Sequence, residues 1–157
     1  MAWWNYTVTK WSRWRQLSPA ERRVFRQALL LLPALALGLR LLGLRRTQAW
    51  LLRFSRPGAS PVQPIPDAQR LAYLVRAAAA HGPYRATCLP QALAVWWLLR
   101  RHGLSGDLRI GVRKAAGQFE AHAWVEYQGL VLNDRPDVAK HFAPITPTTG
   151  LPQGRLL

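Results

Sequence analysis

One stretch, residues 86–103, predicts a helix whose two ends are both specified by the sequence. Thr87 can serve as the N-cap, and Pro90 is tolerated only in a first helical turn. Gly103 follows a group of cations and predicts the C-terminal end. The helix therefore begins at Cys88, the only cysteine in the chain. The positive end of a helix stabilises a thiolate, which makes this residue a candidate nucleophile, although a lone cysteine is more often a buried core residue.

Two strand patterns follow downstream. Residues 119–127 alternate between apolar and polar side chains, and residues 130–134 continue as a second strand. A three-residue loop at 127–129 predicts a register in which His122 lies directly opposite Asp134. In that register a carboxylate can accept a hydrogen bond from the imidazole. A two-residue turn would instead place the two side chains on opposite faces, so we expect the longer loop.

Cys88, His122 and Asp134 indicate a catalytic site more strongly as a set than any one of them does alone. A single histidine on a strand is more often a half-buried structural residue, and an aspartate at a strand end is more often a turn residue. A cysteine at a helix start, a histidine on a strand and an acid opposite it are the nucleophile, base and orienting group needed for acyl transfer. Cys88, His122 and Asp134 are therefore the candidate catalytic residues.

The sequence around these residues resembles the transglutaminase-like cysteine peptidases that remove leader peptides in lasso peptide biosynthesis, in their stand-alone protease form. The resemblance covers about residues 68–142 and rests on five segments: 88–94, 98–104, 110–113, 119–126 and 131–134. It implies a papain/transglutaminase-like core and a triad that maps onto Cys88, His122 and Asp134. It also implies hydrolysis of a ribosomally made precursor peptide without a cofactor.

The same resemblance implies partners. The substrate is the leader region of the precursor peptide, and a lasso cyclase then closes the ring on the freed core peptide. Residues 1–54 show no alternating strands of the kind expected from a fused leader-binding module. We therefore expect a separate leader-binding protein of the RRE type to present the peptide.

The composition narrows the classes of function. The net charge of +15 is compatible with nucleic acid, an anionic membrane surface or an acidic peptide. The cations are spread in ones and twos with no base-reading motif, so we expect no nucleic-acid partner. The four histidines show no ligand spacing and predict no metal site. A single cysteine cannot form an internal disulfide, which agrees with a cytoplasmic location.

Helical signals dominate the first third of the chain. Residues 18–21 form a capping box that predicts a helix start. The uncharged run 28–39 is shorter than the roughly 20 residues needed to cross a bilayer. Pro33 should kink or divide it, and residues 45–54 should form another short helix. We interpret this region as a buried helical hairpin in preference to a membrane-surface segment.

Prolines mark the domain boundary. Residues 55–66 contain four of the twelve prolines and predict an extended linker between a basic, Trp-rich helical extension, residues 1–54, and the peptidase domain, residues 67–157. Asp67 should cap a helix that ends before Gly82. The prolines after Arg135 make long regular elements improbable.

We therefore expect an α+β fold in which a nucleophile helix packs on a small antiparallel sheet with three strands, the first at residues 108–113. The function expected is that of a cysteine peptidase. Amide transfer on a peptide remains an alternative, because both reactions pass through an acyl-enzyme. A non-catalytic basic scaffold that docks a precursor or a membrane through residues 1–54 is the alternative from a different class.

Overall fold

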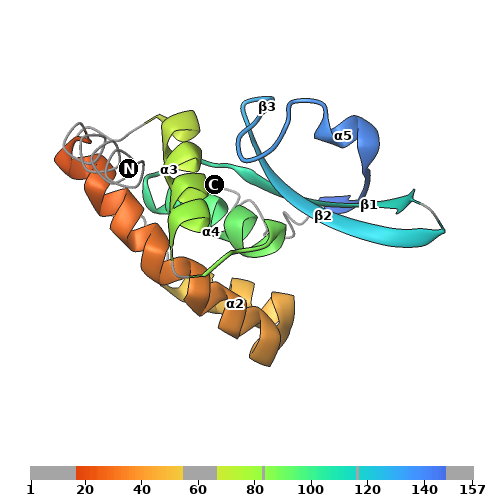
Figure 1. Ribbon diagram of the computed structural model, residues 1–157, viewed down its shortest axis with the longest axis horizontal. Coiled ribbons are helices and arrows are strands. Elements are labelled where there is room, and N and C mark those ends of the chain that lie inside the picture. The colour runs from red at the N-terminus through yellow and green to blue at the C-terminus, as the bar shows by residue number, and fades with distance from the viewer. Residues whose placement is uncertain (1–16, 55–66, 83, 116, 148–157) are drawn as a thin grey trace, which may run out of the picture.

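The computed structural model describes residues 17–54, 67–82, 84–115 and 117–147. In these residues the helices α2 (Pro19–Arg53), α3 (Ala68–His81) and α4 (Cys88–Arg101) come first. They are followed by the strands β1 (Asp107–Ala115), β2 (Gln118–Tyr127) and β3 (Leu130–Val131), the short helix α5 (Val138–His141), and the strand β4 (Ala143–Pro147). Figure 1 shows α2, α3 and α4 grouped on one side, with the β1-β2 hairpin extending away from them and α5 beside the strands. This arrangement confirms the predicted α+β class.

Helix α2 begins as the sequence predicts. The Ser18 hydroxyl accepts a hydrogen bond from the backbone N–H of Glu21, and the Glu21 carboxylate accepts one from the backbone N–H of Ser18. The prediction that Pro33 interrupts the helix is wrong, because the chain stays helical through that exposed residue. The interruption lies at Gly43, whose φ of 75° is a left-handed value that glycine adopts without strain.

The segment after Gly43 folds back along the segment before it. A Cβ atom placed on Gly38 would lie 3.4 Å from the Thr47 side chain. In an unbroken helix these two residues would be about 13 Å apart along the axis. The Thr47 hydroxyl donates a hydrogen bond to the carbonyl oxygen of Gly43 over 2.8 Å. The predicted helical hairpin therefore forms, with its bend ten residues later than Pro33.

The hairpin is buried on one side only. Its buried face carries Val24, Phe25, Ala28, Leu32, Leu35 and Leu51, whereas its exposed large apolar side chains are Leu30, Leu37, Leu41, Leu42, Trp50 and Phe54. By length and composition alone α2 could cross a membrane, a property shared by core helices of soluble proteins and by signal sequences. The uncharged run 28–39 is by itself too short to cross a bilayer. Helix α2 as a whole is long and apolar enough, because apolar residues continue beyond Arg26 and Arg40.

Helices α3 and α4 complete a shared core with α2. The Asp67 carboxylate accepts a hydrogen bond from the backbone N–H of Arg70 over 2.6 Å, as the predicted cap requires. Gly103, with φ of 75°, follows the last turn of α4, and the N–H of Leu104 bonds back to the carbonyl of Leu99 over 3.0 Å. These bonds satisfy carbonyls at the helix end in the way expected of glycine. A hydrogen bond also joins α4 to α2, because the Trp97 indole N–H donates to the carbonyl of Leu51 over 2.9 Å.

The sheet contains one strand more than the sequence predicts. Its order is β3-β2-β1-β4, with all three pairings antiparallel. The additional strand β4 contains Pro144 and Pro147, which hide it from sequence patterns. Because β4 is an edge strand with β1 as its neighbour, a proline can occupy it without removing a bond from the interior of the sheet.

Candidate active site

Cys88 is the first residue of α4, as predicted, and it is partly exposed. Thr87 occupies the N-cap position with extended backbone, but its side chain makes no capping hydrogen bond. The loop before the helix is held instead by Gln91, whose side-chain amide donates to the carbonyl oxygen of Ala86 over 2.7 Å. The thiol-bearing residue thus stands at the positive end of a helix, and the chain just before it is tied to the first turn by the Gln91 bond.

His122 lies on β2, on the sheet face opposite to the core residues Ala123 and Val125. Its ring stacks with two aromatic side chains. The ring centroid of Trp124 is 6.4 Å away and that of Phe142 is 5.0 Å away, with interplanar angles of 24° and 28°. These contacts hold the plane of the imidazole while its side chain remains 24% exposed.

The structure brings His122 and Asp134 together. The Nε2 atom of His122 is hydrogen-bonded to Oδ2 of Asp134. The other carboxylate oxygen of Asp134 accepts a hydrogen bond from the backbone N–H of Arg135 over 2.7 Å. Because both oxygens have partners, the carboxylate is held in one orientation toward the histidine. A carboxylate in this position fixes the tautomer of an imidazole and stabilises its protonated form.

The predicted register that motivated this pair is wrong. Tyr127 pairs with Leu130 and Glu126 pairs with Val131, so the connection is the two-residue turn Gln128-Gly129. Both turn residues have positive φ, 49° and 78°, which is the type I′ geometry that matches the twist of a hairpin. The expectation that this turn would separate His122 from Asp134 is also wrong, because β3 ends at Val131 and strand alternation no longer governs the residues after it.

Asn133 guides the chain from the end of β3 to Asp134. The backbone N–H of Leu132 still donates to the carbonyl of Val125 over 2.9 Å. In return, the N–H of Val125 donates to the side-chain oxygen of Asn133 over 2.7 Å and not to a backbone carbonyl. The side chain thus replaces a ladder bond at the point where the chain leaves the sheet. This departure allows the next residue to turn back toward His122.

A glycine makes room for the aromatic residue over His122. Gly111 is the β1 partner of His122. A Cβ atom at this position would lie 2.8 Å from Cβ of Phe142 and 2.9 Å from Cη2 of Trp124. On the outer side, the Arg113 guanidinium lies 4.8 Å from the centroid of the Phe142 ring. Sequence reasoning missed Phe142 and Gly111, since their contact joins two strands whose pairing is not visible in the sequence.

Of the three candidate catalytic residues, the structure connects two. Within the described residues no hydrogen bond links Cys88 to His122, although α4 packs against β2. Hydrogen bonds between catalytic groups are often long in a free enzyme and shorten only when substrate is bound. A thiol at a helix start together with an oriented imidazole is the equipment of cysteine-dependent acyl transfer. In the part of the chain that the structure describes, no three histidine, cysteine or acidic side chains gather in a group that could hold a metal ion.

The family model described as the transglutaminase-like superfamily matches residues 29–147. The matched range includes all three candidate catalytic residues and begins inside α2, within the predicted helical extension. Neither the comparison with curated proteins nor the comparison with solved structures gives a match. The matched family suggests cysteine protease or amide-transfer activity.

Proposed function

Because the chain belongs to the transglutaminase-like superfamily, we propose that it is a cysteine peptidase that uses Cys88, His122 and Asp134. The observation that carries the proposal is the hydrogen bond between His122 and Asp134, which orients an imidazole in a family of cysteine-dependent enzymes. The position of Cys88 as the first residue of α4 supports it further.

The proposed reaction has two steps. The Cys88 thiolate attacks the scissile carbonyl, and His122 accepts the thiol proton and returns it to the leaving amine. Water then hydrolyses the thioester with the same histidine as base. The backbone N–H of Cys88 is proposed as one donor to the oxyanion, an interaction whose loss costs about 2.7–4 kcal/mol in other enzymes.

The proposed substrate is the precursor peptide of a lasso peptide, cleaved between its leader and its core. This part of the proposal is supported by the sequence resemblance around the three catalytic positions. A separate leader-binding protein would present the peptide in the cytoplasm, and a lasso cyclase would use the product. Linking two weak contacts in this way raises the local substrate concentration to roughly millimolar.

The experiment combines the purified chain with a lasso precursor peptide, in the presence and absence of a leader-binding protein, and follows the products by mass spectrometry. We expect cleavage that depends on Cys88 and is accelerated by the partner at low substrate concentration. Cys88→Ala should abolish cleavage at unchanged circular dichroism, because a partly exposed cysteine contributes little packing. Cleavage at the wild-type rate by folded Cys88→Ala protein would contradict the mechanism.

Two further measurements separate the alternatives. In ¹⁸O-labelled water, hydrolysis places the label in the new carboxylate, whereas amide transfer to an added amine leaves the product unlabelled. In a non-catalytic scaffold the partly exposed Cys88 thiol should react with iodoacetamide at the slow rate of an ordinary thiol at neutral pH, whereas the proposed nucleophile should be alkylated faster. His122→Ala serves as the control in the labelling experiment, since loss of the base should slow alkylation without removing the thiol.

A further inference from the structure

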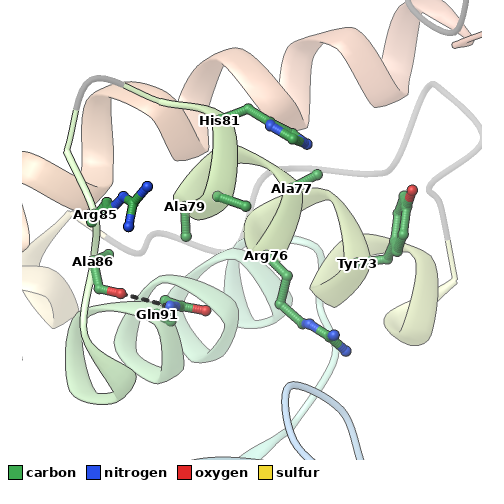
Figure 2. Close-up of a pocket in the computed structure, with 9 residues that line it drawn as sticks. Tyr73, Arg76, Ala77, Ala79, His81, Arg85, Ala86 and Gln91 are labelled. Atoms are coloured by element: carbon green, nitrogen blue, oxygen red, sulfur yellow. Dashed lines mark hydrogen bonds between the residues drawn. The ribbon is translucent and has the colours of Figure 1, made fainter. Parts of the chain in front are cut away.

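A groove lies between α3 and the first turns of α4 (Figure 2). Its volume is 650 Å³, and it is lined by Tyr73, Arg76, Ala77, Ala79, Ala80, His81, Arg85, Ala86 and Gln91. The four alanines leave the space between the larger side chains. In the view of Figure 2, Arg85 and Gln91 lie at one end of the groove, Tyr73 lies at the other, and Arg76 lies between them. Several side chains of an extended peptide fit into such a volume.

The groove carries positive charge that the described residues leave unpaired. Arg76 and Arg85 are both exposed, and among the described residues neither forms an ion pair with a carboxylate. The sequences of α3 and α4 contain no aspartate or glutamate. By contrast, Arg70 on the same helix is paired with Glu21 over 2.6 Å. The two groove arginines therefore remain available for a ligand with negative charge.

The groove adjoins the proposed nucleophile. Its wall includes Ala86, two residues before Cys88, and Gln91, one helical turn after it. Residues three apart on a helix are neighbours on its surface. The hydrogen bond from the Gln91 amide to the Ala86 carbonyl joins these two parts of the wall (Figure 2). A peptide held with its scissile bond at Cys88 can therefore extend from there into the groove.

We propose that this groove binds an acidic side chain or a short acidic segment of the peptide substrate, close to the bond that is cleaved. The inference rests on the proposed function and adds the substrate class to it. Arg76 and Arg85 are the residues that recognise the carboxylates, and the alanine walls accommodate the peptide backbone. A guanidinium suits this role because its fork of N–H donors matches a carboxylate.

Binding is tested first without turnover. Full-length Cys88→Ala protein is titrated against a fluorescent peptide of alternating Asp and Gly, and against the same peptide with Asn for Asp, with anisotropy as the readout. We expect the acidic peptide to bind about tenfold more tightly at low salt, with the difference shrinking as salt is added. Replacing both groove arginines, Arg76→Glu and Arg85→Glu, should remove the preference.

A matched control separates the groove from the overall positive charge. The double variant Arg46→Glu and Arg100→Glu reverses the same number of charges, at two exposed positions outside the groove lining, and should retain the preference. Equal loss in this variant, or equal affinity for the two peptides, would overturn the proposal. Competition by a single-stranded oligonucleotide that depends on the same two arginines would also overturn it, in favour of nucleic acid. The milder pair Arg76→Gln and Arg85→Gln replaces the glutamate variants if those fail to fold.

Turnover then separates this inference from the proposed function. With wild-type protein, a single glutamate is moved along a cleavable peptide, and KM is measured for each position. We expect a position near the scissile bond at which glutamate lowers KM about tenfold, and Arg85→Glu should reverse that preference toward lysine. Cleavage with no preference at any position would refute the groove and leave the peptidase intact. Acidic binding through both arginines with no cleavage of any peptide would support the groove and refute the peptidase.

Discussion

Asp134 accepts a hydrogen bond from His122 although the two residues are not partners in the sheet. The bond forms because the chain leaves β3 after Val131 and is held by Asn133 before it turns back. A side chain at a strand end thus reaches a histidine that regular alternation would have placed out of its reach.

Asp134→Asn should lower turnover by orders of magnitude at unchanged circular dichroism. The amide keeps the shape of the carboxylate but can hold the imidazole in the wrong tautomer, and the equivalent change in a Ser-His-Asp triad lowers kcat about 10⁴-fold. Steady-state kinetics on a peptide substrate measures the effect. A change within about threefold would show that Asp134 does not orient the histidine.

Asn133→Ala should reduce both stability and turnover. The substitution removes the acceptor for the N–H of Val125, a buried residue, and an unsatisfied buried donor costs about 1–3 kcal/mol. Because Asn133 also directs the chain toward Asp134, turnover should fall even at temperatures where the variant is fully folded. Denaturant unfolding and kinetics at low temperature test the two effects separately. Normal kinetics in the folded variant would show that Asn133 does not position Asp134.

Gly111→Ala should destabilise the sheet and disturb His122. The new methyl group would meet Cβ of Phe142 at 2.8 Å, an atom that cannot move without its backbone. Overpacking of this kind costs about 1–3 kcal/mol, and displacement of Phe142 should change the stacking on the imidazole.

Gly38→Ala is the matched control for this substitution. Its nearest neighbours would lie at 3.4 Å, and alanine favours a helix, so this variant should gain about 0.5–1 kcal/mol. Thermal unfolding of both variants measures the contrast. A tolerated Gly111→Ala with a destabilised Gly38→Ala would contradict the packing described for both positions.

Gln128→Asn should stabilise the β2-β3 turn. Gln128 adopts a φ of 49°, which is unfavourable for most residues but is tolerated by asparagine, and Asn-Gly is the preferred pair in a type I′ turn. The gain should reach up to about 1 kcal/mol in denaturant unfolding. A destabilised variant would argue for the three-residue loop that the sequence suggested.

Glu21→Gln should lower stability in a manner that depends on pH. The hydrogen bond from Arg70, followed by the backbone N–H of Ser18, holds the pKa of Glu21 below its ordinary value of 4.5. A lowered pKa in the folded state means that the ionised carboxylate stabilises the protein above pH 4.5 and loses this effect as the pH falls through the folded pKa. The wild type should therefore be more stable by about 0.5–1 kcal/mol at neutral pH. In acid the two proteins should converge, and a constant difference across the range would refute the linkage.

Local features of this protein follow from its amino-acid sequence alone. The capping box at Ser18, the cap at Asp67 and the helix start at Cys88 depend on neighbouring residues, and all are predicted correctly. The limits of β2 are predicted to within one residue, whereas β1 continues to Ala115, two residues beyond its predicted end. The three candidate catalytic positions and the family resemblance follow from short motifs in the same way, and the transglutaminase-like superfamily is confirmed. The catalytic roles stay predictions.

Features that join distant parts of the chain depend on the packing of the folded protein and are not visible in the sequence. The bend at Gly43 was assigned to Pro33, because the sequence does not show where α2 meets α3 and α4. Strand β4 was missed, since its prolines are acceptable only at an edge that forms once β1 lies beside it. The contact between His122 and Asp134 was predicted through the wrong register. The contact arises because the Asn133 side chain, in place of a backbone carbonyl, accepts the hydrogen bond from the N–H of Val125. This substitution can be recognised only once β2 and β3 are paired.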